Sequence, residues 1–284
     1  MEQRIIVLGT GPAGLAAAIA ARSRNKEVLV IGTPMEDSPL ARAERVDNYP
    51  GLPGLTGPEL LRTMDEHARS MGAQIVNGRV NAAMGWGGMF SLTAGSDVYQ
   101  GGALVLAPGV VRPAKFPGEE RLLGRGVSYC ATCDGMLYRN RHVMVVGRTA
   151  DAPQEAAFLH SIGCRVSYVS ARRPEQLADG IDYIPAGRLE VLGEQTVSGL
   201  LIDGVEHPCD GVFILRRAVA PADLLPGLKV TDGCIDVDRG MATNIEGVFA
   251  AGDCTGTPYQ VAKAVGEGLV AGEHAAEYLD AKAK

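Results

Sequence analysis

Residues 5–14 read IIVLGTGPAG, an unbroken apolar run that ends in glycines spaced G-x-G-x-x-G. A continuous run of branched apolar residues predicts a buried strand of a parallel sheet. The alanine-rich stretch from Leu15 to Arg24 predicts a helix, and Val28 to Ile31 predicts the next strand. A glycine-rich turn in such a βαβ unit brings bare backbone N–H groups to a pyrophosphate, so it indicates a dinucleotide site.

A second unit of the same kind begins at His142 and continues through Gly147 into a predicted helix from about residue 150 to 162. Pro108, Gly109, Pro113 and Pro117 mark the crossing that leads to it. The sequence therefore predicts an α/β protein with two doubly wound, Rossmann-like domains, the second inserted into the first. The predicted boundaries are 1–112 with 240–284 for the first domain and 113–239 for the second.

Composition excludes several classes of function. The chain has 284 residues and a net charge of −6, which argues against a nucleic-acid binder. No apolar run approaches the roughly 18 residues that span a bilayer, so no membrane segment is expected. The first strand begins almost at once, with no signal-peptide pattern, and a cytoplasmic location is expected.

Among six cysteines only Cys130 and Cys133 are close in sequence, as Cys-Ala-Thr-Cys. Such a pair can form a readily exchanging disulfide. Asp134 follows directly, and a carboxyl group there can carry protons as thiolates form and leave. One pair supplies too few ligands for zinc, so no metal is expected. The remaining cysteines are expected to be small buried hydrophobes: Cys164, Cys209, Cys234 and Cys254.

Five motifs, in this order and at this spacing, resemble the low-molecular-weight thioredoxin reductase family. They are GTGPAG at 9–14, VDNYPG at 46–51, APG at 107–109, CATCDG at 130–135, and AGD at 251–253 with Gln260 behind it. The likeness covers nearly the whole chain. It implies one domain for FAD, one for NADPH, and a homodimer.

The resemblance also implies the FAD contacts. Asp253 is expected to hydrogen-bond the ribitol, and the amides of Gln260 and Val261 to face the pyrimidine end of the flavin. Asn48 is expected near the flavin. Glu36 is the nearest candidate for the ribose hydroxyls, because a glycine occupies the strand end where an acid is expected. The other expected contacts are Gly9, Gly11, Pro12, Ala13, Gly14, Ala107, Gly109 and Gly252.

Catalysis is assigned by the same resemblance to Cys130, Cys133 and Asp134. Their disulfide would receive two electrons from the reduced flavin and pass them to thioredoxin through a mixed disulfide. In the family the first cysteine attacks the protein substrate and the second faces the flavin. From the residues alone, the expectation is that the more accessible thiolate attacks.

The second domain departs from the family at its phosphate loop. Thr149 stands where the second glycine is expected, and Asp151 places a negative charge near the helix start. The family's His-Arg-Arg cluster is replaced by Val-Ser-Ala-Arg-Arg-Pro at 169–174. These changes argue against NADPH. They resemble the ferredoxin-dependent flavin thioredoxin reductases, a branch that takes electrons from an acidic iron–sulfur protein.

The segment from Arg112 to Arg173 fits such a partner, with nine arginines and one lysine against five acidic residues. Three alternatives stay open. One is an NADPH-dependent reductase with an altered site, another is a flavin-dependent oxidase of small dithiols that uses oxygen, and the third is a non-enzymatic redox sensor. The Cys-Ala-Thr-Cys-Asp string favours thioredoxin reduction over the last two.

Overall fold

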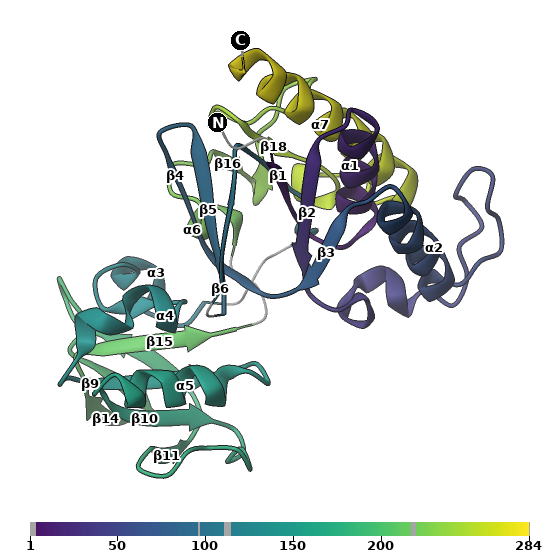
Figure 1. Ribbon diagram of the computed structural model, residues 1–284. Coiled ribbons are helices and arrows are strands. Elements are labelled where there is room, and N and C mark those ends of the chain that lie inside the picture. Colours follow the sequence, from purple (N-terminus) through teal and green to yellow (C-terminus); the bar gives the residue numbers. More distant parts are fainter. Residues whose placement is uncertain (1–3, 96, 111–114, 217–219, 284) are drawn as a thin grey trace. The chain divides into compact units, whose positions relative to one another are not determined.

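The computed structural model describes residues 4–95, 97–110, 115–216 and 220–283 (Figure 1). The chain divides into two compact units, Met1–Arg112 with Ala220–Lys284, and Pro113–Val219. The second unit is therefore inserted into the first. The crossing residues Arg112 and Pro113 lie outside the described residues.

The predicted second boundary at residue 240 was wrong, because residues 220–239 belong to the first unit. Two hydrogen bonds hold this segment to the residues after it. The N–H of Lys229 donates to Asn244 Oδ1 at 2.8 Å, and Asn244 Nδ2 donates to the carbonyl oxygen of Gly227 at 2.9 Å. The sequence between the domains carries no strong strand pattern that would have shown this pairing.

Five parallel strands form the sheet of the first unit, in the order β18-β7-β1-β2-β3. Because a strand from the C-terminal segment pairs with β7, both ends of the chain build one sheet. Its strands are β1 (Arg4–Leu8), β2 (Glu27–Gly32), β3 (Gln74–Asn77), β7 (Ala103–Leu106) and β18 (Val248–Ala250). Its helices are α1 (Pro12–Ser23), α2 (Gly57–Ser70) and α7 (Val261–Lys282), which lie together on one side of the sheet in Figure 1.

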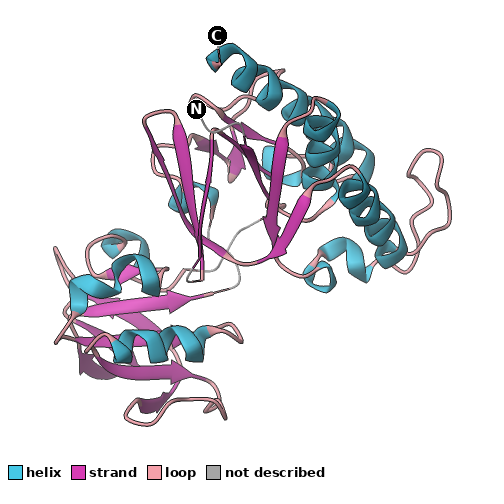
Figure 2. Cartoon of the chain, viewed as in Figure 1, coloured by secondary structure: helices cyan, strands magenta, loops and turns pink. Residues whose placement is uncertain are grey.

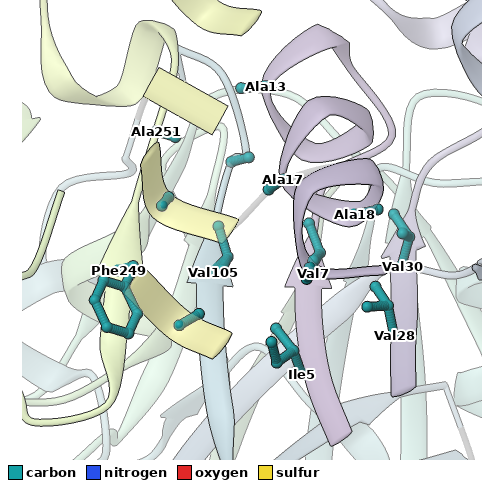
Figure 3. Close-up of a cluster of buried hydrophobic side chains, with 14 of the residues drawn as sticks. Ile5, Val7, Ala13, Ala17, Ala18, Val28, Val30, Val105, Phe249 and Ala251 are labelled. Atoms are coloured by element: carbon teal, nitrogen blue, oxygen red, sulfur yellow. The ribbon is translucent and has the colours of Figure 1, made fainter. Parts of the chain in front are cut away.

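Small residues let α1 and α7 pack closely. A Cβ added to Gly268 or Gly272 of α7 would overlap the carbonyl oxygen of Ala13 or Ala17 in α1. Figure 3 shows alanines of α1 above valines of the sheet, including Val7. The alanine-rich stretch thus forms a closely packed helix that begins within the first glycine turn. This packing fixes the position of the turn.

The first unit has further small elements. The antiparallel sheet β4-β5-β6 lies on the side of the main sheet away from α1 in Figure 1. That sheet consists of β4 (Val80–Trp86), β5 (Met89–Ala94) and β6 (Asp97–Gly101). The remaining small elements of the first unit are β16 (Val230–Thr231), β17 (Cys234–Ile235), α6 (Pro221–Leu224), and the 3₁₀ turns η1 (Met35–Asp37), η2 (Pro39–Arg42) and η4 (Asp253–Thr255).

The second unit repeats the parallel design with strand order β11-β10-β9-β15-β8. Figure 2 draws the strands of both units in magenta and the helices in cyan. Its parallel strands are β8 (Val127–Ser128), β9 (His142–Gly147), β10 (Arg165–Ser170), β11 (Asp182–Pro185) and β15 (Gly211–Leu215). The other elements are β12 (Leu189–Leu192), β13 (Gly199–Ile202), β14 (Val205–Pro208), α3 (Glu119–Leu122), α4 (Ala131–Asp134), η3 (Gly135–Tyr138) and α5 (Ala152–Ser161). The predicted class, two Rossmann-like α/β domains, is confirmed.

Candidate active site

Three loops that are far apart in the sequence meet at one edge of the first sheet. Strands β18, β7 and β1 are parallel neighbours, so the segments after their carboxyl ends lie side by side. Ala107 N–H donates to Leu8 O at 2.7 Å, and Ala251 N–H donates to Leu106 O at 2.9 Å. The three predicted FAD motifs, GTGPAG, APG and AGD, therefore share this edge.

The glycine turn leaves bare backbone at one position and close packing at the other two. A Cβ on Gly9, whose φ is 122°, would overlap Ala107 O, and a Cβ on Gly14 would overlap Gly9 O. A Cβ on Gly11 would meet nothing within 4 Å. Gly11 is also the N-cap of α1, with no side chain capping it and with Pro12 next. Open space beside free helix amides fits a pyrophosphate, so the turn fits FAD.

The missing acid at the end of β2 has a steric reason. A Cβ on Gly32 would lie only 2.8 Å from Thr10 N and Thr10 Cγ2. Thr10 is held there because its Oγ1 donates to the carbonyl oxygen of Thr33 at 2.8 Å. Glu36, the predicted substitute, is exposed in η1, in the segment that follows β2 at this edge of the sheet.

A lysine and a glutamate of α7 hold the loop that carries Asp253. Lys263 Nζ donates to Gly252 O at 2.8 Å, and Glu267 Oε2 accepts from Gly252 N–H at 2.9 Å. Lys263 also donates to Thr255 Oγ1 at 2.9 Å. Sequence reasoning missed both residues, because a Lys–Glu pair four apart on a helix is usually a surface ion pair.

Burial raises the pKa of Asp253 above its ordinary value, and the nearby Glu267 raises it further while Lys263 lowers it. A half-buried carboxyl group that is costly to ionise gains most from hydroxyl donors, which the sugar chain of FAD supplies. Asn48 and Gln260 meet although they are far apart in the sequence, because Asn48 Nδ2 donates to Gln260 Oε1 at 2.6 Å. Val261 begins α7 directly after them.

The redox pair lies in the second unit. Cys130 and Cys133 are joined by a disulfide, with Cys130 as the N-cap of the short helix α4. Cys130 is buried, with 3% of its surface exposed, whereas Cys133 is exposed. A group that approaches from solvent therefore meets Cys133 first. By accessibility alone the attacking sulfur would be Cys133, whereas the family resemblance assigns that role to Cys130.

Asp134 is fixed beside the disulfide by a serine that sequence reasoning missed. Ser128 Oγ lies 2.7 Å from Asp134 Oδ2 and accepts a hydrogen bond from the N–H of Cys130 at 3.1 Å. A serine two residues before the first cysteine gives no sequence signal of its own. Only the fold shows that its hydroxyl faces the Cys-x-x-Cys segment.

The first glycine of the second turn is packed closely, as Gly9 is in the first turn. A Cβ on Gly147 would overlap Tyr168 Oη, because the buried ring of Tyr168 extends to this point. Burial, and secondarily Asp151, raises the pKa of Tyr168 to about 12. The guanidinium of Arg148 lies over the ring of Phe116, 5.5 Å from its centroid. The position that needs bare backbone beside a pyrophosphate, that of the second glycine, is taken here by Thr149.

Three of the other four cysteines are buried as predicted, and the prediction was wrong for Cys234. Burial raises the pKa of the Cys209 and Cys254 thiols to about 12 each, and it also raises the pKa of Cys164. These three are buried, whereas Cys234 is partly exposed.

The described part of the chain contains no group of three or more His, Cys, Asp and Glu side chains that could hold a metal ion. In the same part of the chain no helix is long and apolar enough to cross a membrane.

Residues 3–268 match the family model for pyridine nucleotide-disulphide oxidoreductases. The chain belongs to this family. It is accordingly an oxidoreductase that uses FAD, and the glycine turn and the Asp253 loop of the first unit fit that cofactor.

Relatives agree on the family but carry different names. A thioredoxin reductase from Listeria monocytogenes is 33% identical, over 97% of this chain and 93% of its own length. A glucosaminate ammonia-lyase from Pseudomonas fluorescens is 37% identical, over 98% and 96%. A solved ferredoxin-flavin thioredoxin reductase from Clostridium acetobutylicum is 42% identical and covers 99% of both chains with a TM-score of 0.86. Family membership alone therefore does not name the substrate, and the site must supply it.

Proposed function

We propose that this protein is a disulfide reductase that passes electrons from reduced FAD through Cys130 and Cys133 to thioredoxin, and that its electron donor is ferredoxin. The observation that carries the proposal is the Cys130–Cys133 disulfide with Asp134 beside it, in a chain of this family. The similarity to a solved ferredoxin-flavin thioredoxin reductase supports both the substrate and the donor.

The altered turn of the second unit argues against a nicotinamide donor. A pyrophosphate needs glycine where it presses on the chain, and here Thr149 stands at that point while Tyr168 lies behind Gly147. Asp151 at the N-cap of α5 repels phosphate. Each lost charge-assisted hydrogen bond weakens nucleotide binding by about 1.5–3 kcal/mol. The exposed Arg172 and Arg173 favour the second candidate, an NADPH-dependent reductase with a rebuilt 2′-phosphate site.

Exposed arginines of the second unit support an acidic protein as donor. Arg125 and Arg141 line a pocket of about 260 Å³, and neither has an ion pair within the described residues. Leu137, an exposed apolar residue close to Cys133 in the sequence, lines the same pocket. Two exposed arginines beside an exposed leucine, in a pocket that Asp210 also lines, suit electrostatic steering of an acidic partner.

The residues would divide the work as follows. Gly11 and the first amides of α1 hold the pyrophosphate of FAD, and Asp253 holds its sugar chain. Bound FAD supplies the electron pair. The exposed Cys133 is the sulfur open to reduction, and Asp134 moves a proton to or from the sulfurs. Cys130 attacks thioredoxin, the role that the family resemblance gives it, and Cys133 then resolves the mixed disulfide.

The test of the donor offers reduced ferredoxin, NADPH and NADH in turn and follows flavin bleaching in a rapid-mixing experiment. We expect bleaching by ferredoxin alone, slowed by salt. Changing Arg139 and Arg141 to Glu should slow it further, while Arg188→Glu, an exposed arginine outside the basic segment, should not. Rapid bleaching by NADPH with ferredoxin inert would establish the second candidate instead.

The test of the substrate uses single-cysteine variants. Cys133→Ser and Cys130→Ser should each abolish thioredoxin reduction while flavin reduction survives, because the two sulfurs act as one unit. Cys133→Ser should trap thioredoxin on Cys130; trapping by Cys130→Ser instead would show that accessibility sets the order. Oxygen consumption with a small dithiol and no thioredoxin turnover would indicate a dithiol oxidase, and no turnover at all a redox sensor. We also propose that the protein is a homodimer and that it is located in the cytoplasm.

A further inference from the structure

The segment before Cys130 is held from both sides by buried polar groups, and one of them contacts the catalytic carboxyl group. Strand β8 consists of Val127 and Ser128 and pairs with β15 at the end of the second sheet. Only 4% of Ser128 is exposed. A buried hydroxyl group requires hydrogen-bond partners, so its partners show what it holds in place.

Both partners of Ser128 belong to the redox segment. Its Oγ lies 2.7 Å from Asp134 Oδ2 and 3.2 Å from Cys130 O, and it accepts from Cys130 N–H at 3.1 Å. A hydroxyl has one proton to donate. The charged carboxylate is the stronger acceptor and the nearer one, so the proton goes to Asp134.

The opposite side of the segment is anchored independently. Tyr129 Oη donates to Glu119 Oε1 at 2.7 Å, and Arg216 Nη2 donates to Glu119 Oε2 at the same distance. Glu119 also accepts from Phe116 N–H at 2.8 Å and has no exposed surface. With Tyr129 fixed in this way, Ser128 is a rigid support and not a mobile contact.

We propose that Ser128 is a positioning residue, which holds the Asp134 carboxyl group at the disulfide so that it can transfer a proton there. Two electrons break the Cys130–Cys133 bond and leave two thiolates, and each takes one proton to become a thiol. When the dithiol reduces a substrate disulfide, the Cys130–Cys133 bond forms again and the substrate S–S bond breaks, so two protons leave the enzyme thiols and two are taken up by the substrate sulfurs. Asp134 is flexible about its side-chain bonds, and the hydrogen bond from Ser128 removes that freedom before the reaction.

The inference rests on the proposed roles of the cysteines and Asp134, but its test does not need ferredoxin. The FAD-loaded protein is reduced with dithiothreitol, freed of reagent, and mixed with a small aromatic disulfide or with oxidised thioredoxin. We expect Ser128→Ala to lower the limiting rate between about tenfold and a hundredfold, towards the lower end of general acid–base effects. The substrate concentration for half-maximal rate should not change.

A double-mutant comparison separates positioning from stability. If Ser128 acts through Asp134, then Ser128→Ala combined with Asp134→Asn should be no slower than Asp134→Asn alone. Ser128→Thr, which keeps the hydroxyl, should recover most of the rate. Ser167→Ala is the matched control, because Ser167 is also 4% exposed and bonds His142 Nε2 at 2.9 Å, away from the cysteines.

Three results would overturn the proposal: a full rate in Ser128→Ala, losses that add in the double variant, or an equal loss in Ser167→Ala. Urea unfolding of each variant shows that the compared proteins are folded. If the unaltered protein reduces the small disulfide but not thioredoxin, the proposed substrate is wrong while the role of Ser128 is still measured.

Discussion

The chain builds a strand–turn–helix twice, at Gly9–Gly14 and at Gly147–Ala152, and the two turns differ in what lies against them. In the first, the Cβ position of Gly11 faces open space beside the uncapped start of α1. In the second, Thr149 replaces that glycine, and Tyr168 fills the space behind Gly147. The same backbone design therefore has open space at the second-glycine position in one unit and a branched side chain there in the other.

The largest expected effect is at the open turn. Gly11→Val should weaken FAD binding by about 10²- to 10⁴-fold, because two or more charge-assisted contacts of about 1.5–3 kcal/mol each are lost. Fluorescence titration of apoprotein with FAD measures it. Gly266→Val is the matched control, since Gly266 also faces open space but lies on α7, outside the motifs. Equal FAD affinity in both variants would contradict the assignment of this turn.

In the second turn, a substitution should lower the free energy of unfolding and leave FAD binding unchanged. Gly147→Ala forces the buried Tyr168 to move, and overpacking of this kind costs about 1–3 kcal/mol. Urea unfolding should show the loss with FAD affinity unchanged. Adding Tyr168→Phe should restore only part of the stability, because Cζ of the ring would still overlap the new Cβ. Weaker FAD binding in Gly147→Ala would break the contrast between the two turns.

Asp253 should lower the stability of the apoprotein and strengthen FAD binding. Its pKa is raised in the folded protein, chiefly by burial, so ionisation opposes folding at pH values above that raised pKa. The opposition disappears once the pH falls below the ordinary value of about 4. Apoprotein with Asp253→Asn should therefore unfold at higher urea than the unaltered protein at pH 7, and the gap should close in acid. FAD affinity should fall in the same variant, while the exposed Asp179→Asn should change neither.

The smallest expected effect comes from restoring one glycine in the second turn. Thr149→Gly should raise NADPH affinity by less than about tenfold, because Asp151 at the start of α5 still repels the phosphates and 1.4 kcal/mol corresponds to one factor of ten. Equilibrium titration with NADPH measures the change. Tight NADPH binding in this single variant would show that Thr149 alone closes the turn.

Local sequence signals predicted the parts of the fold that depend on local physics. The strand–glycine–helix pattern at Gly9–Gly14, the second strand start at His142 and the Cys-x-x-Cys pair all appear where they were expected. The boundary near residue 240 was misplaced, because a two-strand hairpin held by Asn244 has no periodic pattern. Lys263, Glu267 and Ser128 were missed because their roles depend on partners that chain folding brings to them.

The sequence by itself determined two nucleotide-type folds and a redox pair, because glycine spacing, apolar runs and adjacent cysteines act within a few residues. Only the tertiary structure decided how each site is completed. It brings Gly9, Ala107 and Gly252 to one sheet edge, because parallel strands from distant segments become neighbours. It also places Tyr168 behind Gly147 and buries Cys130 while Cys133 stays exposed. These are properties of packing between elements, which no local pattern encodes.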